Sequence, residues 1–528
     1  MIRSSMPATS LTTAHSGTLT ERLFGLDLRS LALFRIGVGL LLLTGLAYRL
    51  EDLAAHYSDQ GALPRAARIF LNPHEQFTAP PYWMSLHMVS GAVWFQGLLM
   101  AVAAALAIAV VAGYRTTWTM FGSWLMLVSL QARNPLVLQG GDDLLRLMLF
   151  WSCLLPCGAV WSYDARRAPI SHTMRYTSLA SAGMLLQLAC MYFFTALLKT
   201  GPSWRVTFDA IHYALSLDHF TTSFGYWLLA YPAFLKILTA ATYALEFLGP
   251  LLLFLPRGNA RIRVLLFLAF VGLHLGIALT LELGMFPWIC MACWLIVLPT
   301  ECWDFMSRPF RSRASVTARR TRSSRVPARH QLGWIGHALC LLLILHMLLL
   351  NVVRLRGGIE SHLSPGPIRW AGALLAQNQY WCMFSPGPMR FGSWLRIEGV
   401  RTDGTRVNLL HPGRELQTHK PPRVAATYRS QRWRKYLMNL MERNSPVHRT
   451  AVSHYLLRRW HATHPDDPGF AQVEVLCMCA PTPPAGTQPS QQPPVTEVLI
   501  WRHSAASATP HPSTAHAGTT GPAADTSL

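Results

Sequence analysis

Residues 190–204 are Cys190-Met191-Tyr192-Phe193-Phe194-Thr195-Ala196-Leu197-Leu198-Lys199-Thr200-Gly201-Pro202-Ser203-Trp204, an apolar run that ends in a lysine. Long cationic side chains at helix ends often extend to a membrane surface, where lysine and tryptophan are common. A lysine in this place can also act as a base, because desolvation disfavours its charged form. The rest of the chain has to decide between these two roles.

The composition is that of a protein that crosses a membrane several times. Of the 528 residues, 51% are hydrophobic and only 13% are charged, whereas soluble domains carry about 25% charged residues. Apolar runs of about 20 residues, the length that spans a bilayer, recur along the chain. The formal net charge is +21, but much of the excess arginine lies in loops between apolar runs, as the positive-inside rule describes. With no RNA motif present, we exclude a nucleic-acid partner and expect a lipid bilayer.

The apolar runs predict an all-α polytopic fold with about nine transmembrane helices. The sixth run could also form two helices that meet near Ala240. The predicted spans are residues 31–48, 92–112, 117–132, 144–160, 176–198, 227–254, 264–281, 288–298 and 332–353.

Differences in amino-acid composition divide the chain into four parts. Residues 1–24 are polar, with no signal peptide, and predict a disordered tail, and residues 25–353 hold the spans. Residues 354–480 predict a small mixed α/β or β-rich domain, with strands at Trp394–Glu398 and Val473–Leu476 and a helix at 428–441. The Pro-, Ser- and Thr-rich residues 481–528 predict a second disordered tail.

Arginine-bearing loops alternate with loops that hold more carboxylates. If the N-terminus is cytoplasmic, Arg115 and the arginines of 166–175, 257–263 and 307–330 all lie on the cytoplasmic side. This orientation places Lys199 and, because the number of spans is odd, the 354–480 domain on the extracytoplasmic side. We expect a multi-pass protein of a bacterial inner or plasma membrane.

Few polar residues stand out as candidate sites. Arg35 and Glu246 are the main charges within spans, and they either pair with each other or line a cavity with Lys199 and His274. Asn134 and Asp142 lie beside the membrane in a segment that is either a turn with a helix cap or a polar site. No spacing typical of metal ligands accompanies the histidines, so we expect no metal.

Several of these stretches resemble the HTTM (horizontally transferred transmembrane) domain family, whose characterised relative is vitamin K-dependent γ-carboxylase. The resemblance covers roughly residues 25–480. It is carried by Tyr192-Phe193 leading to Lys199 and Trp204, and by His274 ten residues before Gly284-Met285-Phe286-Pro287. Further similar stretches are Leu31-Ala-Leu-Phe-Arg35-Ile-Gly, Arg133-Asn134 with Gly140-Gly-Asp142, and Gln379-Tyr380-Trp381-Cys-Met383-Phe384-Ser-Pro386.

The resemblance implies quinone-dependent oxygenation or carboxylation, with a reduced, vitamin K-like quinone, oxygen and carbon dioxide. Lys199 would be the base that takes a proton from the quinone, and His274 and Asn134 would orient the quinone or stabilise an oxyanion. The residues expected to bind the quinone are Trp204, Met285, Phe286 and Trp288. A secreted peptide or protein would be the substrate.

One position departs from the family pattern. The carboxylase has a histidine directly after the residue that matches Asn134, whereas this chain has Pro135, which bears on proton handling. The alternative function is a non-enzymatic membrane factor for maturation, export or immunity of a secreted peptide or protein. A transporter is disfavoured, because no paired repeats with interrupted helices are visible.

Overall fold

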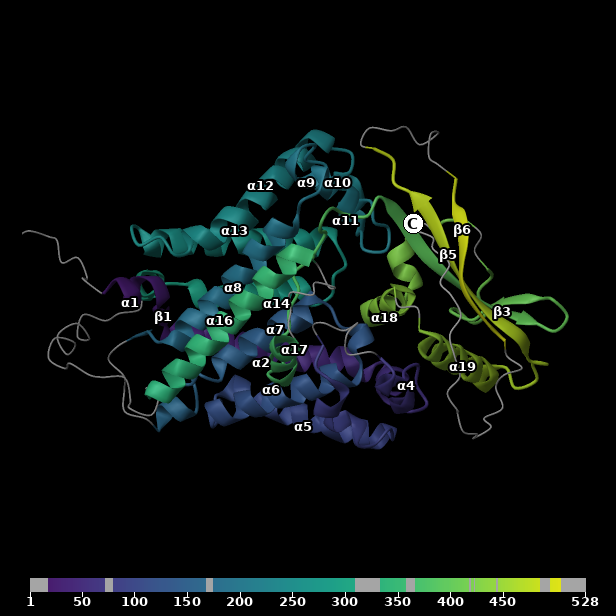
Figure 1. Ribbon diagram of the computed structural model, residues 1–528, viewed down its shortest axis with the longest axis horizontal. Helices are drawn as coiled ribbons and strands as arrows, with labels where there is room; N and C mark the ends of the chain where they lie inside the picture. The colour runs from purple at the N-terminus through teal and green to yellow at the C-terminus, as the bar shows by residue number, and fades with distance from the viewer. Residues whose placement is uncertain are drawn as a thin grey trace, which may run out of the picture.

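The computed structural model describes residues 18–71, 79–167, 174–308, 333–357, 366–416, 419–421, 423–442, 445–484 and 494–504. The chain forms a long helical bundle, and a smaller unit with a four-stranded sheet lies at one end of it (Figure 1). The arginine-rich segment at 307–330 falls almost entirely outside the described residues.

Long helices joined by short ones build the bundle. In chain order they are α1 (Leu19–Phe24), α2 (Leu28–Leu50), α3 (Leu53–Tyr57), α4 (Arg65–Ile69), α5 (Val93–Ala112), α6 (Thr116–Arg133), α7 (Gly140–Ser152), α8 (Leu179–Leu198), α9 (Pro202–Arg205), α10 (Ala210–Leu215), α11 (Ser223–Leu228), α12 (Pro232–Leu252), α13 (Asn259–Thr280), α14 (Phe286–Trp294), α15 (Thr300–Ser307), α16 (Trp334–Gly357) and α17 (Gly366–Leu374). Two short strands, β1 (Leu26–Asp27) and β2 (Arg175–Tyr176), pair antiparallel.

Among the described residues, six helices are long and apolar enough to cross a membrane, namely α2, α5, α8, α12, α13 and α16. A seventh span results if Phe286–Val297 and Thr300–Ser307, which meet at 88°, are counted as one. The nine predicted spans are therefore not all present as separate long helices. The predicted span at 117–132 is α6, which buries polar side chains along its last turns, and the span at 144–160 shortens to the 13 residues of α7.

The sixth apolar run divides, but not at Ala240. Helix α11 ends at Leu228, and α12 then continues unbroken from Pro232 to Leu252. The break falls there because proline has no backbone N–H to donate and is favoured at the first position of a helix.

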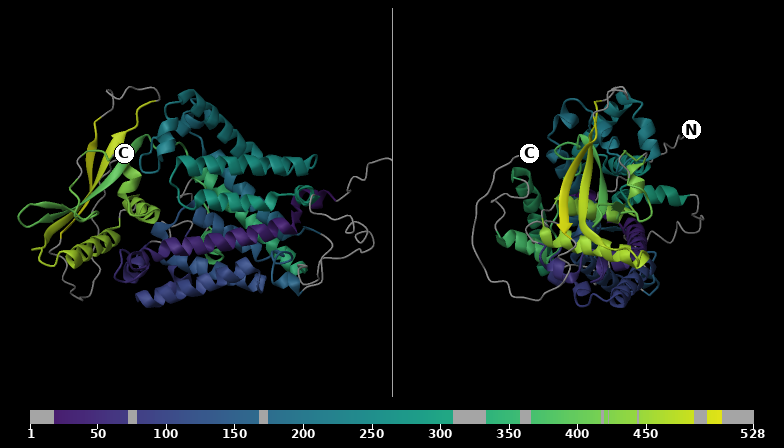
Figure 2. Two further views of the ribbon diagram at one scale, coloured as in Figure 1. Left: turned by 180° about the vertical axis from the view of Figure 1, so that it is seen from behind. Right: turned by 90° about the vertical axis from the view of Figure 1, so that its right-hand side faces the viewer.

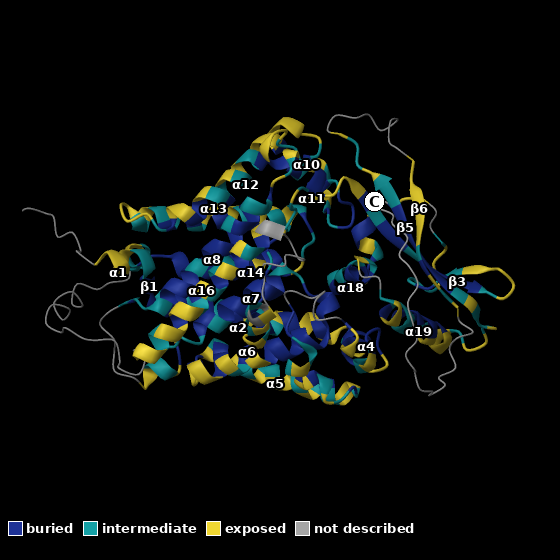
Figure 3. Cartoon of the chain, in the orientation of Figure 1, coloured by how far each residue is buried: buried dark blue, intermediate teal, exposed yellow. Residues whose placement is uncertain are grey.

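Helix α8 is the centre of the bundle. Its first turn is capped by Ser178, whose hydroxyl accepts a hydrogen bond from the backbone N–H of Ser181 at 3.2 Å. Of its apolar window, 78% is buried inside the protein, against 22% for α5 and for α13 (Figure 3). The residues of α8 are therefore packed against neighbouring helices on nearly every side.

The peripheral helices α5, α13 and α16 expose large apolar side chains along their length (Figure 3). A soluble protein rarely leaves contiguous apolar surfaces of this kind uncovered. Hydrocarbon chains of lipids cover them without cost, so the bundle is that of a multi-pass integral membrane protein. The exposed residues include Trp94, Leu98, Leu265, Leu268 and Leu342.

The C-terminal unit contains an antiparallel sheet in the order β4-β3-β5-β6, with β3 (Phe391–Arg401), β4 (Arg406–Asn408), β5 (Phe470–Pro481) and β6 (Thr496–Ser504). Helices α18 (Gln431–Glu442) and α19 (Pro446–Thr463) lie between the sheet and the bundle (Figure 2). The predicted strands at Trp394–Glu398 and Val473–Leu476 fall within β3 and β5. Trp394, Ile397, Tyr436 and Val473 share one core, which also takes in Leu136 of the bundle.

Two segments differ from the predicted disordered tails. Residues 496–504 form β6, because pairing with β5 provides hydrogen bonds that the local composition does not reveal. Residues 19–24 form α1, where Thr18 and Glu21 make a reciprocal capping box.

Candidate functional site

Lys199 lies directly after the last residue of α8, at the end of the bundle that faces the C-terminal unit. The chain turns away at Gly201, whose backbone N–H donates to the carbonyl oxygen of Pro386 at 2.8 Å. A β-carbon at residue 201 would lie 2.7 Å from that oxygen, so only glycine fits this close approach. This contact fixes the turn that follows the helix.

The ammonium group of Lys199 is enclosed by protein. Its Nζ forms an ion pair with the carboxylate of Glu246 on α12, and it lies 4.0 Å from the centre of the Trp204 ring. Only 2% of the residue is exposed. An interfacial anchor would extend its charge to water, whereas this charge is held by a carboxylate and an aromatic face.

Glu246 therefore pairs with Lys199 and not with Arg35. The Arg35 guanidinium donates instead to the backbone carbonyls of Val110, Val111 and Trp161, at 2.9, 3.1 and 2.6 Å. The hypothesis of an Arg35–Glu246 pair is wrong, because Arg35 lies where the ends of α5 and the 153–163 turn leave carbonyl groups without helical partners.

His274 on α13 lies in a second polar cluster at the face of α8. Its Nε2 is 2.6 Å from the hydroxyl of Tyr192, which also accepts a 3.0 Å hydrogen bond from the indole N–H of Trp294. From this pattern we assign the Tyr192 hydroxyl as donor to Nε2, which leaves the hydrogen of His274 on Nδ1. Within the described part of the chain Nδ1 has no hydrogen-bond partner, although the side chain is buried.

The two clusters lie one above the other along α8. Tyr192 and Lys199 are seven residues apart, which corresponds to about two helical turns, or about 10 Å, on the same face. Lys199 and His274 are not joined by a direct hydrogen bond or ion pair, since each has another partner. Phe270 stacks on Trp294, with ring centres 4.0 Å apart, so the cluster around His274 is bordered by aromatic side chains.

Asn134 lies elsewhere and has a structural role. Its side-chain amide donates to the carbonyl of His56 at 2.9 Å and accepts from the backbone N–H of Leu136 at 3.2 Å. These bonds cap the short 3₁₀ turn Pro135–Val137. The structure thus places both Lys199 and His274 beside α8, although His274 belongs to α13. Asn134 lies near neither of them.

The four residues predicted to bind a quinone are spread over three places. Trp204 packs under Lys199, and Phe286 lies 5.7 Å from His274 between ring centres. Trp288 is 53% exposed, and Met285 is buried between two pockets. We call these the arginine-capped pocket (lined by Leu42, Leu46, Arg49, Ser123, Asp142 and Arg432, among others) and the α18 groove (lined by Tyr48, Glu51, Glu282, Trp288 and Gln431, among others).

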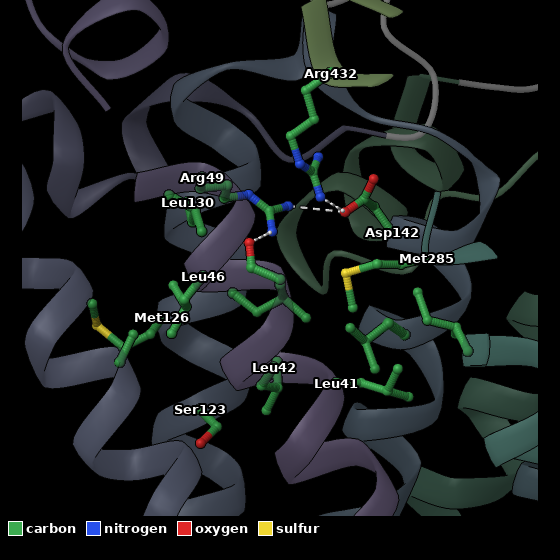
Figure 4. A pocket seen from close by; sticks show the side chains of 15 residues that line it. Leu41, Leu42, Leu46, Arg49, Ser123, Met126, Leu130, Asp142, Met285 and Arg432 are labelled. Atoms are coloured by element: carbon green, nitrogen blue, oxygen red, sulfur yellow. Dashed lines mark hydrogen bonds and ion pairs between the residues drawn. The ribbon is translucent and has the colours of Figure 1, made fainter. Parts of the chain in front are cut away.

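The arginine-capped pocket has apolar walls and a charged end (Figure 4). Arg49 of α2 and Arg432 of α18 both approach one oxygen of Asp142, at 2.9 and 3.4 Å. Burial raises the pKa of the Asp142 carboxyl, but Arg432, Arg49 and the backbone N–H of Gln139 outweigh it, so the pKa lies below its usual value. Burial and the neighbouring Arg49 lower the pKa of Arg432.

Sequence reasoning missed Glu246 as the partner of Lys199, as well as Arg49, Arg432 and Ser123. Arg49, like Lys199, is a charged residue at the end of an apolar run, so the same pattern could have identified it as a candidate site residue. Arg432 carried no signal, because it belongs to another unit and lies 290 positions from Asp142 in sequence. Among the described residues, no three His, Cys, Asp or Glu side chains are grouped to hold a metal ion.

The sequence over residues 25–303 matches the HTTM domain model. The chain belongs to the HTTM domain family. Neither a curated protein nor a solved structure was found to match it. The matched residues extend from just before α2 into the first half of α15, so they include Lys199, Glu246 and His274, whereas Arg432 and the C-terminal unit lie beyond them.

Proposed function

We propose that this HTTM protein is a membrane enzyme in which Lys199 and Glu246 form a buried proton-transfer pair. The observation that carries the proposal is the enclosure of Lys199 by Glu246 and Trp204 at the end of α8. Moving charges out of water is costly, and hydrophobic side chains of similar size would stabilise a fold equally well. A buried pair that can exchange a proton suits acid–base chemistry.

In this mechanism Lys199 takes a proton from the substrate after passing its own to Glu246. Proton transfer from Nζ to Oε2 converts the ion pair into a neutral amine and a carboxylic acid. The net charge of the two side chains together is zero before and after the transfer. Trp204 excludes water from the amine. His274, whose Nδ1–H has no partner among the described residues, donates a hydrogen bond to an oxygen of the substrate.

A reduced quinone fits the chemistry of these side chains. The unpartnered Nδ1 of His274 suits an oxygen of a quinone, and the ring of Phe286, whose centre lies 5.7 Å from that of His274, adds aromatic surface beside it. When bound, such a quinone supplies the acidic hydroxyl and, with oxygen and carbon dioxide, the oxygenation or carboxylation chemistry. The chain's own contribution is to accept the proton at Lys199 and to hold the oxygen at His274.

The proposal includes an orientation. The N-terminus lies in the cytoplasm, and Lys199 and the C-terminal unit lie on the extracytoplasmic side of a bacterial inner or plasma membrane. The distribution of arginines between alternate loops supports it. A secreted peptide or protein substrate would then approach from the side of the C-terminal unit.

The test is an epoxide assay. Purified protein is incubated with reduced naphthoquinone and oxygen, and the epoxide is measured by mass spectrometry. We expect epoxide from the unmodified protein and at least a hundredfold less from Lys199→Ala, because general-base catalysis is worth about 10²–10⁴-fold. Lys236→Ala is the control, since Lys236 lies exposed on α12. Equal amounts of epoxide from Lys199→Ala and Lys236→Ala would refute the proposed enzymatic function. So would the absence of epoxide from a folded unmodified protein.

A non-enzymatic factor for maturation, export or immunity of a secreted peptide is the second candidate. The observation that favours it is β6, which pairs only with β5 in the described sheet and exposes Thr496–Leu499 at the edge. Extended peptides bind to such edges by adding a strand. A folded protein that yields no epoxide under all conditions would favour this candidate.

A further inference from the structure

A separate pocket lies at the end of the bundle opposite the C-terminal unit, where Figure 1 labels α1 and β1. It opens between the turn before α13, the paired strands β1 and β2, and the start of α15. Its volume of about 300 Å³ leaves room for a small ligand group. We call it the basic pocket, and the residues that line it include Asp27, Arg175, Arg261, Arg263, Thr300 and Glu301.

Of the described residues, four arginines but only two carboxylates line the basic pocket. Both carboxylates already have arginine partners, because Asp27 pairs with Arg29 at 2.8 Å and Glu301 pairs with Arg175 at 3.2 Å. Arg261 also lines the pocket, and it forms no ion pair within the described part of the chain. The pocket therefore carries positive charge that its own carboxylates do not offset.

Helix α13 begins at this pocket without a compensating negative charge. Asn259 is its first residue, and the first turn contains Arg261 but no acidic side chain and no side-chain cap. The first N–H groups of a helix have no partner within it, and their partial positive charge favours anions. A β-carbon at Gly258 would meet nothing within 4 Å, so the space beside this turn is open.

Arg263 is an independent sign of a partner from outside the chain. It is 3% exposed, and its Nη1 and Nη2 donate to the carbonyl oxygens of Gly25 and Leu23, at 2.8 and 2.5 Å. Within the described residues its Nε has no hydrogen-bond partner, and neither has the buried hydroxyl oxygen of Thr300. Buried polar atoms are rarely left in this state. The positive-inside rule explains arginines that lie in water, such as Arg257, but not a buried guanidinium without a carboxylate.

We propose that the basic pocket binds a phosphate group, whose oxygens accept hydrogen bonds from the first turn of α13, Arg261, Arg263 and Thr300. Donors that converge from two helices and two guanidinium groups suit phosphate, which offers more acceptor oxygens than a carboxylate. The pocket lies at the ends of the apolar helices α2 and α13, at the level of lipid head groups. The proposal does not rest on the chemistry at Lys199, which lies at the other end of the bundle.

The phosphate group can belong to a phospholipid or to a soluble molecule, and two pairs of additives separate these sources. The full chain is unfolded thermally in uncharged detergent, with dioctanoyl phosphatidylglycerol or dioctanoylglycerol, and with sodium phosphate or sodium chloride at equal ionic strength. We expect the phosphate-bearing member of at least one pair to raise the unfolding temperature more than its partner, because a ligand of the folded state stabilises it. The effective pair identifies the source. Equal shifts within both pairs would overturn the proposal.

Matched variants locate the binding. Arg261→Gln should weaken binding of the effective additive about tenfold or more, because a hydrogen bond to a charged group is lost. Its control is Arg257→Gln, at an exposed arginine just before α13 that does not line the pocket. Ala260→Glu places a carboxylate in the first turn of α13, where it favours the helix, so the protein should fold yet lose the response to phosphate. Equal affinities of the two arginine variants, or an unchanged affinity in Ala260→Glu, would refute the site.

Discussion

At the scale of single residues, Lys199 differs from a lysine that anchors a helix to a membrane surface. An anchor loses little when it is replaced, because its charge lies in water. Lys199 has exchanged water for Glu246 and Trp204, so each charge of the pair depends on the other. This dependence has a measurable consequence for stability.

Removing one charge of the pair should destabilise the protein more than removing both. Lys199→Met leaves Glu246 buried without compensation, which costs about 3–5 kcal/mol, and Glu246→Gln should cost a similar amount. The double variant Lys199→Met/Glu246→Leu should lose less than either single variant, because no buried charge remains. Thermal unfolding in detergent measures all three. Additive losses would show that the two residues are not coupled.

At the scale of elements, the position of α8 depends on small residues where it meets α7. Gly183 faces the ring of Trp151, and a β-carbon there would lie 2.4 Å from Cη2. Trp151 is fully buried and cannot move aside. The peripheral helix α13 has glycines of another kind, because a β-carbon at Gly276 would meet nothing within 4 Å.

Gly183→Ala should therefore destabilise the bundle, and Gly276→Ala should not. Overpacking at Gly183 should cost about 1–3 kcal/mol, whereas alanine at Gly276 should be neutral or stabilise by up to about 1 kcal/mol through its higher helix propensity. Unfolding temperatures of the two variants test the contrast. A loss at Gly276→Ala as large as at Gly183→Ala would contradict the central packing of α8.

At the scale of the whole molecule, basic side chains of the C-terminal unit hold it to the bundle. Arg434 donates to the backbone carbonyls of His219 and Glu282, and Arg423 pairs with the Glu282 carboxylate. His56 of α3 packs against Trp433 of α18, with ring centres 4.4 Å apart. Histidines buried beside basic side chains at this interface make it sensitive to acid.

The interface should loosen as the pH falls. Burial lowers the pKa of His56 and of His219 from 6.5 to about 3, and nearby cations, two arginines at His56 and an arginine and a lysine at His219, contribute to the shift. Between pH 6.5 and 3 the unfolded chain binds protons that the folded chain does not, so stability is lost as the pH falls through this window. At pH 5 each histidine should cost roughly 2 kcal/mol relative to pH 7.

Substitution of His56 tests the pH dependence. His56→Phe keeps the stacking on Trp433 but cannot be protonated, so the fall in unfolding temperature between pH 7 and pH 5 should be markedly smaller than in the unmodified protein. His461→Gln, at an exposed histidine, should leave the fall unchanged. An unchanged acid sensitivity of His56→Phe would contradict the role of this residue.

Much of the architecture follows from the sequence alone. Apolar runs of bilayer length predict the six long helices, since every backbone polar group in lipid must be satisfied within the segment. The HTTM family and the end of α8 at Lys199 are also visible in the sequence, because both are properties of contiguous residues. The shorter α6 and α7 were predicted as full spans, because apolar composition does not distinguish burial in protein from exposure to lipid.

Only the tertiary structure decided which residues meet. Glu246 follows Lys199 by 47 positions, and Arg432 lies 290 positions from Asp142, so no local pattern could pair them. Asn134 was predicted to act together with Lys199 and His274, yet its side chain caps a turn elsewhere in the bundle. Hydrophobic periodicity specifies which face of a helix is buried, whereas partners of buried charges depend on how the helices and the C-terminal unit pack together.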